Sequence, residues 1–350
     1  MTLAKAILKQ DYQVPTFPTG WFAIALSKEV KKGEILSRTF SGKDVVIFRT
    51  ESGKAAVLDA YCPHMGAHFA HGGSVEGEDI KCPFHGFCFN TDGECTKTGY
   101  GTKPSPRAKS YSWPVDEKMG IIFCWYHPEQ IAPTYHIDTM ESDEFTDYKI
   151  HTWEMISNPT ETAENSVDVG HFSHIHGYKD PHSINPLKLD GPFLNVKYGM
   201  YRNGDFIGKP KKNFLIEFEI FQQGLGFALV EAHTIELGVK TRHLVMPTTI
   251  AGKEMYLRIG CAVGKIKDPG KIMPILKILP KSLITKIMHR EAFKGYIHDV
   301  YQDFKVWQNK IYLTPPALSK GDGPIMQYRA WAAQFDYELN QRVNANIEDN

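Results

Sequence analysis

The sequence lacks any long apolar run. Its longest apolar stretches, such as 214–221 and 272–279, are interrupted by Lys or Glu, and none approaches the roughly 20 residues of a membrane-spanning helix. The first twelve residues carry Lys5, Lys9 and Asp11 where a signal peptide would have an apolar core. We therefore expect a cytoplasmic protein with no integral membrane span.

The chain also lacks an excess of charge of either sign. Its 40 Lys and Arg residues balance 40 Asp and Glu residues, so the overall charge indicates neither a nucleic-acid partner nor a membrane-surface partner. Cysteines number only six. Two of them stand close before a His, and we expect the other four, Cys88, Cys95, Cys124 and Cys261, to be free thiols outside any disulfide framework.

The chain is long enough for two domains, and its sequence patterns indicate that they differ in secondary structure. A length of 350 residues is long for one core. Residues 20–130 hold short apolar runs separated by Gly, Asp and Lys, which indicate strands. Residues 145–265 combine strands, in which apolar and polar residues alternate, with one helix that carries the histidine-containing run described below. Residues 271–310 are expected to be helical. We expect an α+β protein, with a small β-domain followed by a larger α+β domain.

A first metal site is indicated by two short motifs. Cys62-Pro-His64 and Cys82-Pro-Phe-His85 are separated by seventeen residues. Two thiolates and two imidazoles can hold zinc, or a [2Fe–2S] cluster in which two His ligate one of the irons. Zinc fingers pair Cys with Cys, whereas each half-site here carries one Cys and one His. This spacing favours the cluster, and the nearby His68 and His71 are interpreted as loop histidines.

A second metal site is indicated by a run that contains three histidines. The run is Glu164-Asn-Ser-Val-Asp168-Val-Gly-His171-Phe-Ser-His174-Ile-His176-Gly177. Two His and one carboxylate with open positions form the usual ligand set of O₂-activating non-haem Fe(II). His171 and His174 would share one face of a helix. His171 and His176 are five residues apart and can reach the same metal only where the helix ends, and Gly177 supplies that end as a C-cap. From the residues alone, a zinc site or a structural His cluster stays open.

The carboxylate has to come from elsewhere in the chain, and two candidates lie close together. Asp299 and Asp303 both fall in the helical segment that ends at Trp307. Asp303 lies on the apolar face with Val300 and Trp307, where an ionised carboxylate needs a strong partner such as a metal. Asp299 lies further round the helix. A surface Asp303 that forms a salt bridge is the alternative.

In these motifs the chain resembles the oxygenase (alpha) component of Rieske non-haem iron oxygenases, most closely the branch of ketosteroid hydroxylases and sterol desaturases. The resemblance implies a Rieske β-domain over 17–130 and a catalytic helix-grip domain over 131–350, with 1–16 packing on the latter. It also implies the site residues. The cluster ligands would be Cys62, His64, Cys82 and His85, the ligands of the mononuclear iron would be His171, His176 and Asp303, and Asp168 would bridge an iron-ligating His to a cluster His of the neighbouring subunit.

One departure from the respiratory Rieske proteins bears on the redox potential. Those proteins carry a disulfide between the cluster loops and hydroxyl donors to the cluster sulfurs. Here Ala67 and Phe84 stand at the disulfide positions, and Phe87 and Phe89 stand at the hydroxyl positions. Fewer hydrogen bonds to sulfur stabilise the reduced cluster less, so we expect a lower potential, suited to feeding an oxygenase iron.

The resemblance further implies a function and partners. The chain would be the terminal oxygenase of a multicomponent system that uses O₂ to hydroxylate or desaturate a bulky, apolar, steroid-like substrate. Because the sequence has no G-x-G-x-x-G motif, electrons from NAD(P)H would come through a separate ferredoxin or flavin reductase. A head-to-tail homotrimer would let them cross between subunits. The alternatives are an aryl O-demethylase, another natural-product monooxygenase, a Rieske electron carrier and a zinc protein.

Overall fold

The computed structural model describes residues 2–8, 12–204 and 208–348. The chain forms two compact units. We call Thr19–His136 together with Thr248–Glu254 the β unit, and Met1–Pro18, Ile137–Pro247 and Met255–Asn350 the α+β unit. None of the helices in the described part of the chain is long and apolar enough to cross a membrane.

The β unit consists of three small antiparallel sheets. Their strand orders are β1-β11-β10, β2-β3-β4-β9 and β5-β6-β7-β8. The strands are β1 (Gly20–Leu26), β2 (Ile35–Phe40), β3 (Lys43–Arg49), β4 (Ala55–Asp59), β5 (Ser74–Glu76), β6 (Asp79–Lys81), β7 (Cys88–Phe89), β8 (Cys95–Lys97), β9 (Ser112–Trp113), β10 (Val115–Lys118) and β11 (Ile121–Tyr126), with the 3₁₀ turn η1 (Ser27–Glu29). The strands predicted from the short apolar runs of residues 20–130 are confirmed. The segment Thr248–Glu254 joins this unit through hydrogen bonds from Ser41 N–H to the Thr249 carbonyl and from Thr248 Oγ1 to the Ala23 carbonyl.

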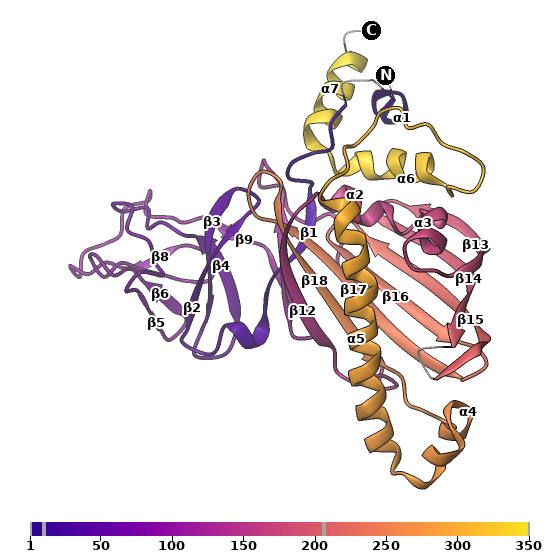
Figure 1. The fold of residues 1–350 in the computed structure, drawn as a ribbon. Coiled ribbons are helices and arrows are strands. Elements are labelled where there is room, and N and C mark those ends of the chain that lie inside the picture. The colour runs from indigo at the N-terminus through magenta and orange to yellow at the C-terminus, as the bar shows by residue number, and fades with distance from the viewer. Residues whose placement is uncertain (1, 9–11, 205–207, 349–350) are drawn as a thin grey trace. The chain divides into compact units, whose positions relative to one another are not determined.

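The α+β unit is built on one seven-stranded antiparallel sheet in the order β12-β18-β17-β16-β15-β14-β13. Helices lie on one face of this curved sheet, with α5 running along it (Figure 1). The strands are β12 (Lys149–Ile156), β13 (Lys179–Asp190), β14 (Phe193–Gly204), β15 (Lys209–Gln223), β16 (Phe227–Thr234), β17 (Val239–Thr249) and β18 (Glu254–Val263). The helices are α1 (Leu3–Ala6), α2 (Pro159–Glu164), α3 (Val169–His174), α4 (Pro269–Ile272), α5 (Lys281–Trp307), α6 (Ile325–Ala332) and α7 (Tyr337–Glu348), with 3₁₀ turns η3 (Pro274–Ile278) and η4 (Ala333–Phe335). The predicted α+β class and helix-grip architecture are confirmed.

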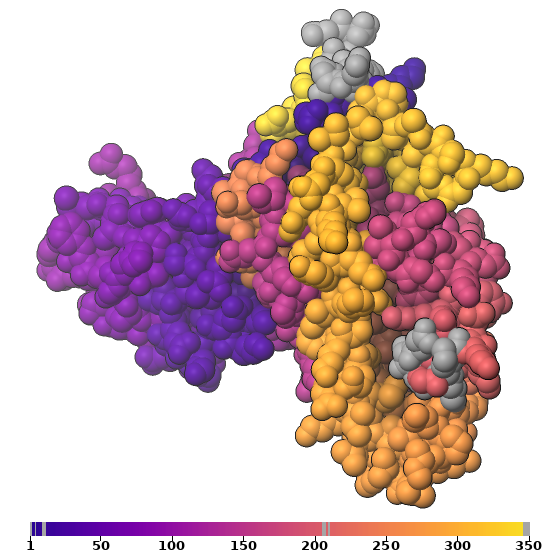
Figure 2. Space-filling view, viewed as in Figure 1, coloured from indigo at the N-terminus to yellow at the C-terminus, as the bar shows by residue number. Residues whose placement is uncertain are grey.

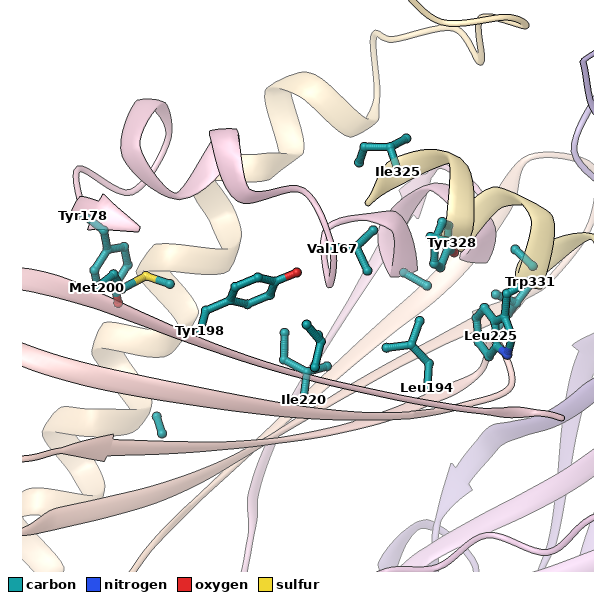
Figure 3. Close-up of a cluster of buried hydrophobic side chains, with 14 of the residues drawn as sticks. Val167, Tyr178, Leu194, Tyr198, Met200, Ile220, Leu225, Ile325, Tyr328 and Trp331 are labelled. Carbon is teal, nitrogen blue, oxygen red and sulfur yellow. The ribbon is translucent and has the colours of Figure 1, made fainter. Parts of the chain in front are cut away.

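Two apolar clusters hold the helices on the sheet. In one, α6 and the turn after α2 cover β14 and β15 through Tyr328, Trp331 and Val167; Figure 3 shows these side chains facing strand residues such as Leu194 and Ile220. In the other, the apolar face of α5 packs on β12 and β18 through Val300, Phe304 and Trp307. Val167 and Tyr178 of the first cluster flank the segment that carries His171 and His176, and Val169 and Phe172 pack against the same cluster, so this packing fixes the backbone of the second metal motif.

The helical structure expected over 271–310 is confirmed, and it is divided into three elements. The chain forms α4, then η3, and only then α5 from Lys281. Pro274 begins η3, and Pro280 stands as the N-cap of α5. Proline donates no backbone hydrogen bond and disfavours the α conformation in the residue before it, which accounts for the two breaks.

Candidate metal centres

The two motifs of the β unit form two loops with the same hydrogen bonds. Cys62 N–H donates to the Ala67 carbonyl at 2.8 Å, and Cys82 N–H donates to the Phe87 carbonyl at 2.8 Å. In each loop a glycine four residues after the Cys, Gly66 or Gly86, has a left-handed φ of +78° or +66°, which residues with a Cβ rarely adopt. The glycines thus close two equivalent turns that present one Cys and one His each.

The four side chains of these loops come together. The His64 and His85 rings lie 4.8 Å apart between centroids, and Phe87 stacks on His64 at 4.2 Å. Burial raises the pKa of the Cys62 thiol to about 12, and the neighbouring Cys82 adds to the shift. All six cysteines are free of disulfides, as expected, although Cys95 is only half-buried.

These residues fit a Rieske [2Fe–2S] cluster. The Nδ1 atom of His85 is buried and has no hydrogen-bond partner among the described residues. A bond to iron would satisfy this nitrogen, and cationic iron would stabilise thiolates that burial otherwise disfavours. His68 lies beside the loops but bonds elsewhere: its Nδ1 accepts from Ala70 N–H, and its Nε2 lies 3.4 Å from Ser37 Oγ.

In the α+β unit, Asp168 begins the helix that carries His171. Asp168 is the N-cap of α3, and its Oδ1 accepts from His171 N–H at 3.2 Å. The ring Nδ1 of His171 bonds to the backbone carbonyl of Asp168, so its Nε2 is left as the free coordinating atom. The carboxylate of Asp168 is about one-third exposed, which leaves room for a contact with another group.

His176 lies just beyond this helix. The C-cap is Ile175, and Gly177 has a φ of +69° two residues later, so the prediction of Gly177 as the C-cap is wrong by two positions. The His171 and His176 rings nevertheless lie close together, 5.2 Å apart between centroids. Nδ1 of His176 donates to Gln302 Oε1 at 3.0 Å, which directs its Nε2 away from that helix side chain.

Asp303 on α5 completes the group. Ligand atoms of His171, His176 and Asp303 all lie within 4.8 Å of one another, and Asp303 Oδ2 lies 3.5 Å from His176 Nε2. Burial raises the pKa of Asp303 to about 7, with help from Asp299 and Asp168, and burial lowers the pKa of His171 to about 4. Two imidazoles and a buried carboxylate suit a divalent iron, which would stabilise the ionised carboxylate.

The two rival candidates for this group lie elsewhere. His174 is exposed on α3. Asp299 forms an ion pair with Arg202 at 3.2 Å. The structure thus brings together the three residues that the resemblance implied and leaves out the two that the spacing alone kept open.

A large apolar cavity opens beside the triad. Its volume is about 630 Å³, and both His171 and Asp303 line it. Inward-facing positions of β15, β16 and β17 form one wall. The members of that wall with apolar side chains include Ile216, Phe218, Ile220, Val230, Ala232 and Val245. A cavity of this size and lining is typical of a site for a small apolar ligand.

Several functional candidates in the cavity were missed from the sequence. Arg202 lines it but is neutralised by Asp299. His243 lines it too; its Nε2 bonds Thr241 Oγ1 at 2.7 Å, and burial lowers its pKa to about 4. Gln302, which bonds His176, was also missed from the sequence; it is not among the residues that line the cavity, and its position directly before Asp303 was the only signal for it. Arg242 and Arg258 are not among the lining residues.

Taken together, the fold and the two centres define a Rieske-type non-haem iron oxygenase. Comparison with protein families agrees with this class. Residues 20–112 match the Rieske [2Fe-2S] domain, and residues 124–336, more than half of the chain, match the 3-ketosteroid 9alpha-hydroxylase C-terminal domain. The chain belongs to this family of Rieske oxygenases. It is an oxidoreductase whose cofactors are a [2Fe–2S] cluster and a mononuclear iron, with O₂ as co-substrate.

Individual relatives cover nearly the whole chain. The chain is 30% identical over 348 residues to cholesterol 7-desaturase nvd of Drosophila melanogaster, which covers 94% of this chain and 77% of that protein. It is 26% identical over 336 residues to the oxygenase component of 3-ketosteroid-9-alpha-monooxygenase of Rhodococcus rhodochrous, which covers 92% and 85%. Among solved structures, NdmA of Pseudomonas putida CBB5 with caffeine matches at a TM-score of 0.69 and 16% identity over 89% of each chain. That last similarity shows the fold alone.

Proposed function

We propose that this protein is the terminal oxygenase of a multicomponent system that hydroxylates or desaturates a bulky, apolar, steroid-like molecule. The observation that carries the proposal is the cavity of about 630 Å³ beside His171, His176 and Asp303. Relatives named as acting on cholesterol and on 3-ketosteroids support the same class. NAD(P)H would supply electrons through a separate ferredoxin or flavin reductase.

We assign Cys62, His64, Cys82 and His85 to the cluster and His171, His176 and Asp303 to the mononuclear iron. When bound, the iron supplies the O₂ chemistry, and the cluster supplies the electron. The chain's own contribution is to fix the ligands, to exclude water and to orient the substrate. Gln302 holds His176, Asp168 holds His171, and the apolar wall of β15–β17 excludes water and positions an apolar molecule.

The electrostatics of the cavity favour a neutral substrate. Its lining includes one arginine, Arg202, and that arginine already pairs with Asp299. A carboxylate substrate would have to break this pair or bind without a counter-ion, which is unfavourable in a buried site. The Thr241–His243 pair offers a neutral polar contact for one hydroxyl or ketone.

The test is substrate-stimulated O₂ consumption with a surrogate reductase and NADH. The panel contains sterols, ketosteroids, methoxyarenes and aromatic acids. We expect sterols or ketosteroids to raise the rate and to yield a hydroxylated or desaturated product. Stimulation by methoxyarenes alone would replace the proposal with an aryl O-demethylase. No stimulation, together with normal reduction of the cluster, would favour an electron carrier.

Assembly and location are proposals as well. We infer a head-to-tail homotrimer in the cytoplasm, in which the cluster of one subunit serves the iron of the next through Asp168. The exposed part of the Asp168 carboxylate supports this role, since a bridging group has to be reachable from a neighbour.

A further inference from the structure

An exposed apolar ridge lies at the N-terminal end of α5. The ridge consists of Met273, Ile275, Ile278, Leu279, Leu283 and Ile287. Ile275 and Ile278 are 63% and 77% exposed, which is unusual for side chains of this size when they gather in one segment. Figure 1 shows α4 and the start of α5 extending past the sheet, and in Figure 2 this orange segment forms one end of the α+β unit. Buried Ile272 and Ile284 hold the ridge from beneath.

Basic side chains surround the ridge. Lys271, Lys277, Lys281 and Lys286 are all exposed, and none forms an ion pair with any residue that the structure describes. Between 265 and 290 the sequence has six lysines, one arginine and a single acidic residue, Asp268. The even charge balance of the whole chain therefore conceals a strongly basic segment.

The ridge is continuous with the cavity. Met273 and Ile287 of the ridge line the cavity, as do their neighbours Leu276 and Met288. Met288 lies fifteen residues before Asp303 on the same helix, a distance of about 22 Å at about 1.5 Å per residue. The ridge therefore marks the end of the cavity that is far from the metal triad.

We propose that this ridge docks on an anionic lipid membrane and that the apolar substrate enters the cavity from the bilayer. Apolar tips among lysines suit the boundary between headgroups and acyl chains, because the lysine stems extend along the apolar surface while the ammonium groups reach the headgroups. A second copy of this chain fits the ridge less well, since a two-fold contact would bring lysines against lysines. The route of entry rests on the proposed steroid-like substrate, whereas the docking does not.

Vesicle binding by the holoenzyme tests the docking. The protein is sedimented with phosphatidylcholine vesicles that contain or lack phosphatidylserine. We expect binding only when phosphatidylserine is present, and release by added salt. The double variant Lys277→Gln/Lys281→Gln should bind about 25-fold more weakly, about fivefold for each charge. Ile275→Ser/Ile278→Ser should lose at least about tenfold, because two apolar side chains no longer leave water.

Matched controls lie off the ridge. Ile311 is 75% exposed and follows the opposite end of α5, and Lys320 is also exposed. Ile311→Ser and Lys320→Gln should bind vesicles as the parent does. Binding of the ridge variants equal to that of the parent would overturn the proposal, as would equal binding to both kinds of vesicle. A changed assembly mass in the ridge variants, without a change in vesicle binding, would identify the ridge as a contact between copies and would also overturn it.

Substrate delivery separates this inference from the proposed function. Ridge variants should oxidise a sterol supplied from cyclodextrin at the parental rate and lose turnover only with the sterol held in vesicles. Absence of turnover by the parent with either delivery would count against the steroid-like substrate, and the sedimentation result would still decide the docking.

Discussion

Gln302 and Asp168 each fix the coordinating nitrogen of one histidine. Gln302 Oε1 accepts from His176 Nδ1, and the Asp168 carbonyl bonds to His171 Nδ1. The first contact uses a side chain and the second uses the backbone. Substitution can therefore remove the support of His176 without touching the ligand, whereas the support of His171 survives a change of the Asp168 side chain.

We predict that Gln302→Leu weakens binding of the mononuclear iron by about 10- to 100-fold, because His176 loses the partner that orients it. Gln302→Glu keeps an acceptor oxygen and should bind iron closer to the parent. The measurement is iron retention during titration with a chelator. Parental affinity in Gln302→Leu would mean that packing alone orients the ring.

The ligand assignment predicts the iron content of single variants. The parent should hold about three irons per chain, two in the cluster and one mononuclear. His171→Ala, His176→Ala and Asp303→Ala should each hold about two and keep the Rieske spectrum, whereas His174→Ala and Asp299→Ala should keep about three. Iron loss in His174→Ala with retention in His176→Ala would reverse the assignment. Stoichiometric zinc without acid-labile sulfide in the parent would refute both centres.

Asp168→Asn isolates the charge of the bridging position. Asn is as good an N-cap as Asp, so α3 and both metal centres should remain intact, while turnover should be nearly abolished because a neutral amide holds a pair of histidines less well. Metal analysis and steady-state O₂ consumption together test this. Asp168→Ala serves as the comparison variant, because it loses the N-cap of α3 as well as the charge. Turnover at the parental rate in Asp168→Asn would remove Asp168 from the electron path.

Helices α2 and α6 are tied together by a buried ion pair. Arg329 Nε and Nη2 donate to the Glu164 carboxylate at 2.6 and 3.1 Å, and both side chains are less than one-tenth exposed. Lys310 lies 3.7 Å from the same carboxylate. Because α2 leads into the segment of Asp168 and His171, this pair supports the backbone of the iron site from behind.

Removal of one partner should be costly. Arg329→Met leaves the Glu164 carboxylate buried beside Lys310, which lies at a longer distance, and we expect the free energy of unfolding to fall by about 3 kcal/mol. Chemical denaturation of the holoenzyme measures this change. The double variant Arg329→Met/Glu164→Leu should recover most of the loss, because the buried charge is gone. A double variant as unstable as the single one would show that packing, and not charge, is responsible.

Transfer of electrons between subunits can be tested in mixed assemblies. His85→Ala should disable the cluster, and Asp303→Ala should remove the mononuclear iron. Neither variant alone should turn over substrate. Co-assembled, they should regain activity, because an intact cluster of one chain can serve an intact iron of its neighbour across a head-to-tail interface. Mixed assemblies of confirmed composition that stay inactive would indicate that both centres must lie in one chain.

The sequence by itself determined whatever depends on near neighbours along the chain. The alternation of apolar residues predicted the strands, and the paired Cys-x-His and Cys-x-x-His motifs predicted two equivalent loops. Such patterns survive in the sequence because the pleat of a strand and a tight turn impose fixed short spacings. The family and the α+β fold followed from these motifs, and both are confirmed.

The tertiary structure decided what depends on residues far apart. The rotation of α5 against the sheet fixed which of Asp299 and Asp303 lies beside His176. Asp303 joins the two histidines, and Asp299 forms an ion pair with Arg202. The support of His176 by Gln302 and the lining of the cavity likewise join distant segments. Helix rotation and packing result from the whole core. A local pattern therefore names the candidates, and only the packed chain determines which of them meet.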